Sequence, residues 1–184
     1  MVFVSDRRGP TEVWFKDFAH GTEKAIFGSA GSAHLPSISA DGSTVIYSAW
    51  NENGLSNFRL NIGRDGAFGV PQLFCAECRN PWMSSSDGRM LLFSPGDVQR
   101  EIYALNIDSG EKKLALAAPS PMLSRPRFSP DDKWIAFIQR GEPLWRIFVA
   151  PYDGTEKRGD QWIAITDGRF AEYMPHWSPD GDLL

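Results

Sequence analysis

Short apolar runs alternate with polar turns along the whole chain. Three of these runs occupy residues 44–48, 90–94 and 134–138, and each follows an Asp-Gly or Asp-Asp turn. Runs of this length, apolar at nearly every position, are typical of strands covered on both faces, and none has the period of a helix. The pattern predicts an all-β protein.

The turn before each run belongs to a phrase that recurs four times. Its aspartates are Asp41, Asp87, Asp131 and Asp180, which lie 46, 44 and 49 residues apart. In the phrase Ser-x-Asp-Gly, Ser starts a turn, Asp can bond the backbone two residues on, and Gly accepts a positive φ. A period in the forties, built from strands and turns, indicates a β-propeller.

Each repeat divides into four strands. The first strand ends in the recurring phrase, and the second is the apolar run. A polar loop leads to a third strand, expected at residues 57–60, 101–105 and 146–149. A Gly turn then gives a hairpin signal, and the fourth strand is expected at residues 71–74, 112–116 and 162–166. We therefore expect about four four-stranded propeller blades.

These strands set the blade boundaries within a single propeller module, residues 1–184. Residues 1–34 form a blade that lacks its first strand, residues 35–79, 80–122 and 123–170 form complete blades, and residues 171–184 supply the first strand of the next or closing blade, beginning at Pro175. The second copy of the phrase departs from the others, because Pro81 lies one residue further from its Asp-Gly and Ser84 replaces a bulky residue. A β-bulge filled by Trp82 or Met83 would explain this.

The phrase Pro-x-Trp-Ser-Pro-Asp-Gly at residues 175–181 resembles the WD-repeat-like units of TolB-type bacterial β-propellers, as do residues 2–9 and 126–137. The resemblance covers essentially the whole chain and implies that it is part of a propeller of six or more blades. Such propellers occur in periplasmic TolB, in prolyl-oligopeptidase-like enzymes, and beside kinase or DNA-binding domains in bacterial regulators. These regulators often carry a Cys-x-x-Cys shortly before the Ser-x-Asp-Gly turn, as residues 75–88 do.

The places where the repeats begin and end allow two interpretations. In one, the chain is a piece of a longer propeller. In the other, the strand from Pro175 pairs with residues 2–4 and closes a ring, which removes exposed edges. The first is favoured, because this repeat type normally builds larger rings. Open blade edges would then make the chain prone to self-association.

Composition narrows the range of partners. The formal net charge is −4 and no basic stripe is present, which argues against a nucleic-acid partner. No apolar stretch approaches the roughly 18 residues that span a membrane, so we expect no direct membrane insertion. No signal peptide is visible, which predicts a cytoplasmic protein if the chain is complete. The resemblance instead implies a periplasmic or extracytoplasmic parent protein.

The chain offers few groups for catalysis or metal binding. Cys75 and Cys78 are its only cysteines; a structural zinc site needs four ligands, and His20, His34 and His176 lie at no finger-like spacing from them. A local disulfide or two structural thiols are therefore favoured over a metal or redox site. No Gly-x-Ser-x-Gly elbow or phosphate-binding loop occurs, and carboxylates that recur in every blade suit turns. We expect no catalytic residue, no metal and no cofactor.

Residues that do not repeat are better candidates for function. Loops between second and third strands gather on one face of a propeller, where partners commonly dock, and exposed Trp and Arg often anchor interfaces. The candidate binding residues in or beside these loops are Arg7, Arg8, Trp50, Asn51, Glu52, Arg140, Glu142 and Trp145. We expect a non-enzymatic propeller that binds a protein or peptide. The alternatives are a substrate-gating propeller of a fused prolyl-oligopeptidase-like hydrolase, the sensor domain of a membrane-anchored bacterial kinase or regulator, and, least favoured, a self-contained glycosidase.

Overall fold

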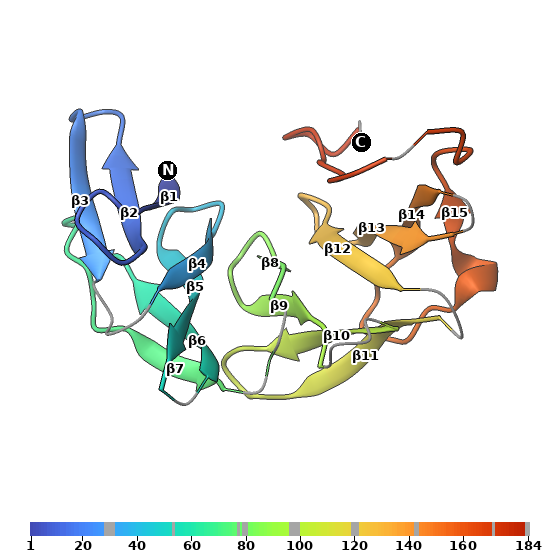
Figure 1. Ribbon diagram of the computed structural model, residues 1–184, viewed down its shortest axis with the longest axis horizontal. Coiled ribbons are helices and arrows are strands. Elements are labelled where there is room, and N and C mark those ends of the chain that lie inside the picture. The colour runs from blue at the N-terminus through green and yellow to red at the C-terminus, as the bar shows by residue number, and fades with distance from the viewer. Residues whose placement is uncertain are drawn as a thin grey trace. The chain divides into compact units, whose positions relative to one another are not determined.

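Antiparallel strands form almost all of the regular structure. The computed structural model describes residues 1–27, 32–52, 54–76, 78, 81–95, 100–118, 122–141, 144–170 and 172–182. Within these ranges there is no α-helix, and a short 3-10 turn, η1, occupies Gly159–Gln161. The chain divides into two compact units, Met1–Pro81 and Trp82–Leu184. Each unit contains two sheets (Figure 1).

Within each sheet of the first unit, every strand pairs with its neighbours in the sequence. The three-stranded sheet has the order β1-β2-β3, and the four-stranded sheet has the order β4-β5-β6-β7. The bounds are β1 (Val2–Ser5), β2 (Glu12–Asp17), β3 (Thr22–Phe27), β4 (Ala33–Ile38), β5 (Thr44–Asn51), β6 (Gly54–Asn61) and β7 (Gln72–Cys75).

The second unit repeats this meander in two four-stranded sheets. Their orders are β8-β9-β10-β11 and β12-β13-β14-β15. The bounds are β8 (Met83–Ser84), β9 (Met90–Phe93), β10 (Glu101–Asn106), β11 (Lys112–Ala117), β12 (Leu123–Phe128), β13 (Trp134–Arg140), β14 (Trp145–Pro151) and β15 (Ile163–Ala164).

This arrangement confirms the predicted fold class, an all-β chain of propeller blades. The second strands of the three four-stranded sheets are buried along most of their length: Val45, Ile46 and Tyr47 of β5 are at most 3% exposed, and Ile135 and Phe137 of β13 are fully buried. Their near-continuous apolar sequence follows from this position, since both faces of the strand meet other side chains.

Neighbouring sheets of each unit share one buried cluster. In the first unit, Val13 of β2 packs in the same cluster as Val45 of β5 and Leu60 of β6. In the second, Leu92 of β9 and Phe137 of β13 belong to one cluster. Fully burying one such side chain stabilises the folded state by about 1.5–3 kcal/mol, so each sheet depends on the next one for its core.

The recurring phrase forms a hydrogen-bonded turn at the end of the first strand. The Ser39 hydroxyl donates to Asp41 Oδ1 at 2.6 Å and accepts the Thr44 backbone N–H at 3.0 Å. Gly42 completes the turn with a φ of +73°, which glycine adopts without steric cost. The same bonds recur in the next two copies, from Ser85 to Asp87 and from Ser129 to Asp131. The turn therefore fixes where each second strand begins.

The third copy replaces the turn glycine with Asp132 and uses it to hold its neighbour. Asp132 has a φ of +58°, a left-handed conformation that costs a non-glycine residue free energy. Its carboxylate accepts hydrogen bonds from the Ser86 backbone N–H, at 2.9 Å to Oδ1, and from the Ser86 hydroxyl, at 2.6 Å to Oδ2. Ser86 lies in the preceding copy of the turn, so the bonds join two neighbouring sheets.

The prediction of a strand beginning at Pro175 is wrong for the described residues. Residues 172–178 belong to no strand, although the turn that follows them forms, with the Gly181 N–H bonded to the Ser178 carbonyl at 3.0 Å. The other first strands are defined by pairing with a second strand. Residues 172–178 instead contact the neighbouring first strand through a side chain, since the Trp177 indole N–H donates to the Arg127 carbonyl of β12 at 3.4 Å.

The predicted bulge in the second copy is present, but it is not specific to that copy. Met83 pairs with Leu92, and the Trp82 N–H also bonds to the Leu92 carbonyl at 2.9 Å, so two residues oppose one. The register also shifts between His34 and Ser37 in β4 and at the corresponding place in β12. A bulge in the first strand is therefore common to these blades.

Replacing Asp132 with Gly separates two opposing effects. The change removes the strain of a positive φ, worth about 1 kcal/mol, but also removes hydrogen bonds to a charged group, worth about 2–3 kcal/mol. We expect the Asp132→Gly variant to lose about 1–2 kcal/mol of unfolding free energy in urea denaturation. The exposed Asp160→Ala change is the control and should stay within about 0.5 kcal/mol. An Asp132→Gly variant as stable as the unchanged protein would contradict the role given to Ser86.

The Ser39 hydroxyl lowers the pKa of Asp41 from 3.8 to about 2, with further hydrogen bonds from Ser43. A carboxyl whose folded pKa is depressed stabilises the fold above its unfolded pKa, and this stability is lost as the pH falls through the folded value. We therefore expect the Asp41 contribution to disappear between about pH 4 and pH 2. Ser39→Ala should raise the Asp41 pKa toward 3.8, as measured by NMR titration of its carboxyl carbon, whereas Ser85→Ala should leave it unchanged. Titration of the unmodified Asp41 at its ordinary value would exclude this account.

Candidate functional site

Arg7 and Arg8, both predicted as binding residues, lie against the indole of Trp14. Their guanidinium carbons are 4.1 Å and 4.8 Å from its ring centroid. Arg8 donates to both carboxylate oxygens of Glu12 at 2.9 Å, and Arg7 donates to Glu23 at 2.7 Å. The hydrogen bonds from Arg8 lower the pKa of Glu12. Ion pairs and cation–π contacts thus hold both arginines in place.

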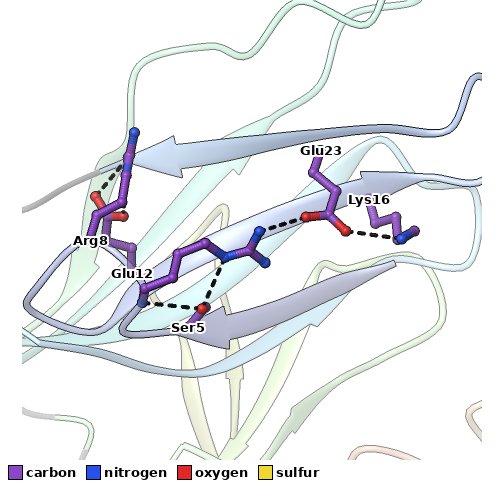
Figure 2. Close-up of polar contacts among 6 residues, drawn as sticks. Ser5, Arg8, Glu12, Lys16 and Glu23 are labelled. Carbon is purple, nitrogen blue, oxygen red and sulfur yellow. Dashed lines mark hydrogen bonds and ion pairs between the residues drawn. The ribbon is translucent and has the colours of Figure 1, made fainter.

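The same contacts anchor the loop between β1 and β2. Glu23 accepts two hydrogen bonds (Figure 2). Its Oε1 accepts one from Lys16 at 2.9 Å, and its Oε2 accepts the one from Arg7. The Arg7 Nε donates to the Ser5 hydroxyl at 3.2 Å. The side chains of Arg7 and Arg8 remain 43% and 56% exposed. The loop therefore presents two oriented cations at its surface.

Trp50, Asn51 and Glu52 lie at the turn between β5 and β6. Trp50 is 55% exposed although it belongs to a strand whose interior is buried. The backbone N–H of Trp50 donates to the Ser32 carbonyl at 3.0 Å. The backbone N–H of Ala33, the residue after Ser32, donates to the Thr11 carbonyl at 2.8 Å. Thr11 ends the loop that carries Arg7 and Arg8. These two bonds run from the end of β5 to the start of β4, and from there to the end of the loop that carries Arg7 and Arg8.

In the second unit, Arg140 and Trp145 are cross-strand partners at the ends of β13 and β14. The Trp145 ring lies 5.6 Å from the ring of Tyr173. Glu142, the remaining candidate, lies outside the described residues. The structure therefore groups the candidates into one set in each unit.

The sequence interpretation missed an aromatic segment beside Trp145. Phe170, Tyr173 and Met174 are 75%, 59% and 51% exposed. Hydrogen bonds to Thr166 hold this segment in place. The Thr166 hydroxyl donates to Glu172 at 2.7 Å, and the Thr166 carbonyl accepts a hydrogen bond from Arg146 Nε at 3.2 Å. The available signal was a cluster of apolar residues just before the strand expected from Pro175, outside the strand pattern.

Known proteins resemble this chain mainly in their fold. No protein-family model matches the chain. An uncharacterized protein of Agrobacterium fabrum is 31% identical over 152 residues, which are 80% of this chain and 48% of that protein. TolB of Acinetobacter baumannii has a TM-score of 0.73 at 18% identity, over 98% of this chain and 43% of TolB. The chain is built from TolB-type β-propeller repeats. An oligogalacturonate lyase in complex with manganese gives a TM-score of 0.58 at 16% identity, over 77% of this chain and 41% of the lyase.

The TolB-type repeats define the fold of the chain. They do not define its activity, which depends on individual residues. The chain spans about half the length of the curated relative that it matches. Propeller neighbours include an enzyme as well as TolB, as expected for a fold that supports many functions.

Cys75 and Cys78 form a disulfide, one of the two structural arrangements that the sequence left open. Both are buried, at 7% and 1% exposure. Asn57, which is fully buried, donates from its amide to the Cys75 carbonyl at 3.0 Å and to the Cys78 carbonyl at 2.8 Å. Its amide oxygen accepts the Ser48 hydroxyl at 2.8 Å. The pair is therefore part of the interior of the TolB-type propeller.

Neither a metal centre nor a membrane-spanning helix is found in the part of the chain that the structure describes. No group of three or more His, Cys, Asp or Glu side chains there is arranged to hold a metal ion. No helix in the same residues is long and apolar enough to cross a bilayer.

The Asn57 network gives a test of how the disulfide loop is held. Asn57→Ala would leave the Ser48 hydroxyl and two buried carbonyls without their partner, and an unsatisfied buried polar group costs about 1–3 kcal/mol. We expect the unfolding free energy to fall by about 2–3 kcal/mol in urea denaturation. Asn106→Ala, at the end of β10 in the second unit, removes a partly buried asparagine and is the matched control. Equal losses in the two variants would show that the Asn57 contacts have no special weight.

Proposed function

We propose that this chain is a non-catalytic TolB-type scaffold that binds a protein or peptide through the loops between its second and third strands. The docking residues are Arg7, Arg8, Trp50, Asn51, Glu52, Arg140, Glu142 and Trp145. The observation that carries the proposal is Trp50, which is 55% exposed at the end of a buried strand. Its backbone N–H bonds to Ser32, and the next residue, Ala33, bonds to Thr11 at the end of the loop of Arg7 and Arg8. Exposed Trp and Arg are the commonest anchors of protein interfaces.

The fixed arginines support binding over a purely structural role. Both keep a large exposed fraction after forming their ion pairs. A side chain that is already held in one geometry loses less conformational entropy when a partner binds, and this favours affinity. The exposed parts of the two guanidinium groups therefore suit a partner with hydrogen-bond acceptors, such as backbone carbonyls, beside an apolar residue that covers Trp50.

The carboxylates that recur in each blade support a role without a covalent step. Asp41, Asp87 and Asp131 each accept the hydroxyl of a serine two residues before them, and the bond from Ser39 or Ser129 is the main cause of a lowered pKa at Asp41 and Asp131. A carboxyl held ionised in a turn is a poor general acid at neutral pH.

The buried disulfide supports a periplasmic or extracytoplasmic location for the parent protein. Disulfides persist in oxidising compartments and are rare in the cytosol. Cys75 and Cys78 are joined in the interior and contribute to no other site among the described residues.

The proposal can be tested by selecting displayed random peptides on the immobilised chain and measuring their affinities by calorimetry. We expect selected peptides to lose about tenfold or more in affinity for the Trp50→Ala variant, because truncation of an aromatic anchor typically costs at least 1–2 kcal/mol. Circular dichroism confirms that each variant is folded.

Phe18→Ala is the matched control. Phe18 is 69% exposed but lies in the turn after β2, away from the loops between second and third strands. Its removal should change affinity by less than about twofold. Peptides that bind the Trp50→Ala and Trp145→Ala variants as tightly as the unchanged chain, or that depend on Phe18 instead, would exclude these loops as the docking surface.

A further inference from the structure

An open pocket of about 600 Å³ lies in the second unit, beside the ends of β10 and β11. Its walls include Glu101, Leu114, Ala117 and Ala118 on one side and Glu156 and Arg158 on the other. The volume is within the range of pockets that hold small ligands or single side chains, about 300–1,000 Å³. None of these residues belongs to the docking residues proposed above, so the pocket is a separate candidate site.

The second wall of the pocket is a loop that docks on the edge of β11. The Lys157 N–H donates to the Ala115 carbonyl at 2.8 Å, and Lys157 pairs with Leu116 as an isolated parallel bridge. The Lys157 ammonium is buried and binds Asp153 at 2.8 Å and Thr155 at 2.7 Å. Because main-chain and side-chain bonds both hold this loop, the pocket is preformed.

The charges in the pocket leave one carboxylate without a cation. Arg158 Nε donates to Glu156 at 2.8 Å, so these two charges compensate each other. Glu101 accepts the Tyr103 hydroxyl at 3.0 Å and, among the described side chains, forms no ion pair. Burial raises the pKa of Tyr103, as do its bond to Glu101 and the negative charges of Glu101 and Glu156. The negative charges of Glu101 and Glu156 therefore both act on the Tyr103 hydroxyl.

The base of the pocket is apolar. Leu114 and Ala117 are half-buried, and Ala118 is buried. An apolar floor with a carboxylate at its rim matches the two parts of a long basic side chain. Lysine and arginine pack their methylene stems on apolar surface and keep the charged group at a polar edge.

We propose that this pocket binds the basic side chain of a lysine or arginine from a peptide or protein partner. The methylene stem lies on Leu114, Ala117 and Ala118, and the ammonium or guanidinium group pairs with Glu101. Arg158, already paired with Glu156, bounds the pocket on the far side and disfavours a second cation. Since none of the pocket residues belongs to the proposed docking loops, the proposal does not depend on those loops.

The test is an NMR titration of the full chain carrying labelled Leu and Ala methyl groups. The probes are the Nα-acetyl amides of lysine, norleucine and glutamate, which separate the stem from the charge. We expect the Nα-acetyl amide of lysine to give saturable chemical-shift changes at the methyl groups of Leu114, Ala117 and Ala118. The norleucine probe should bind about fivefold more weakly, because it lacks one partly exposed ion pair. Stronger binding of the glutamate amide would overturn the proposal in favour of an anion site at Arg158.

Substitution of the rim carboxylate completes the test. Glu101→Gln removes the charge, keeps the shape, and should weaken acetyl-lysine amide about fivefold. Glu111→Gln is the matched control, because Glu111 is exposed at the other end of β11 and pairs with Lys113; it should change binding by less than about twofold. Shifts that do not saturate, or equal binding to the Glu101→Gln variant, would contradict the proposal. A Trp50→Ala variant that binds the probe normally would show that the two sites are independent.

Discussion

The hydrogen bond between a serine and the aspartate two residues later determines how each blade enters its buried strand. The hydroxyl donates to the carboxylate and accepts the first N–H of the second strand, as in Ser39, Asp41 and Thr44. The second strand is covered on both faces, so a backbone group left unpaired at its start would be costly. The turn satisfies that group and sets the strand's starting residue. Since side chains alternate along a strand, this choice decides which residues face the core.

A scaffold that repeats the same turn places its variable chemistry elsewhere. The first sheet shows this in Arg7 and Arg8, which flank Trp14 and bind Glu12 and Glu23. None of these contacts belongs to the repeated turn. They order a loop between strands without changing the strands themselves. A partner surface can therefore vary from blade to blade while the core stays uniform, and this is how one fold supports unrelated functions.

The sequence predicted the features that depend on local pattern. Apolar period, turn residues and spacing correctly gave the sheets and the strand order. For Cys75 and Cys78 they left a disulfide and two structural thiols open, and the structure shows the disulfide. It could not predict contacts between residues distant in the chain. Asp132 reads as an irregular turn residue, and only the fold brings its carboxylate to Ser86. Tyr173 likewise precedes the strand expected from Pro175, and its contact with Trp145 depends on how the preceding segment is held.

The short fourth strand of the last sheet has a cause in the neighbouring sheet. The pattern predicted a strand at residues 162–166, but β15 contains only Ile163–Ala164. The chain before it leaves its own sheet and bonds through Lys157 to the outer edge of β11. An outer edge otherwise exposes unpaired backbone groups, and covering it opposes strand-to-strand aggregation. The same detour places Glu156 and Arg158 opposite Glu101 and so creates the pocket. Protection of an edge and formation of a binding pocket are thus two consequences of one loop.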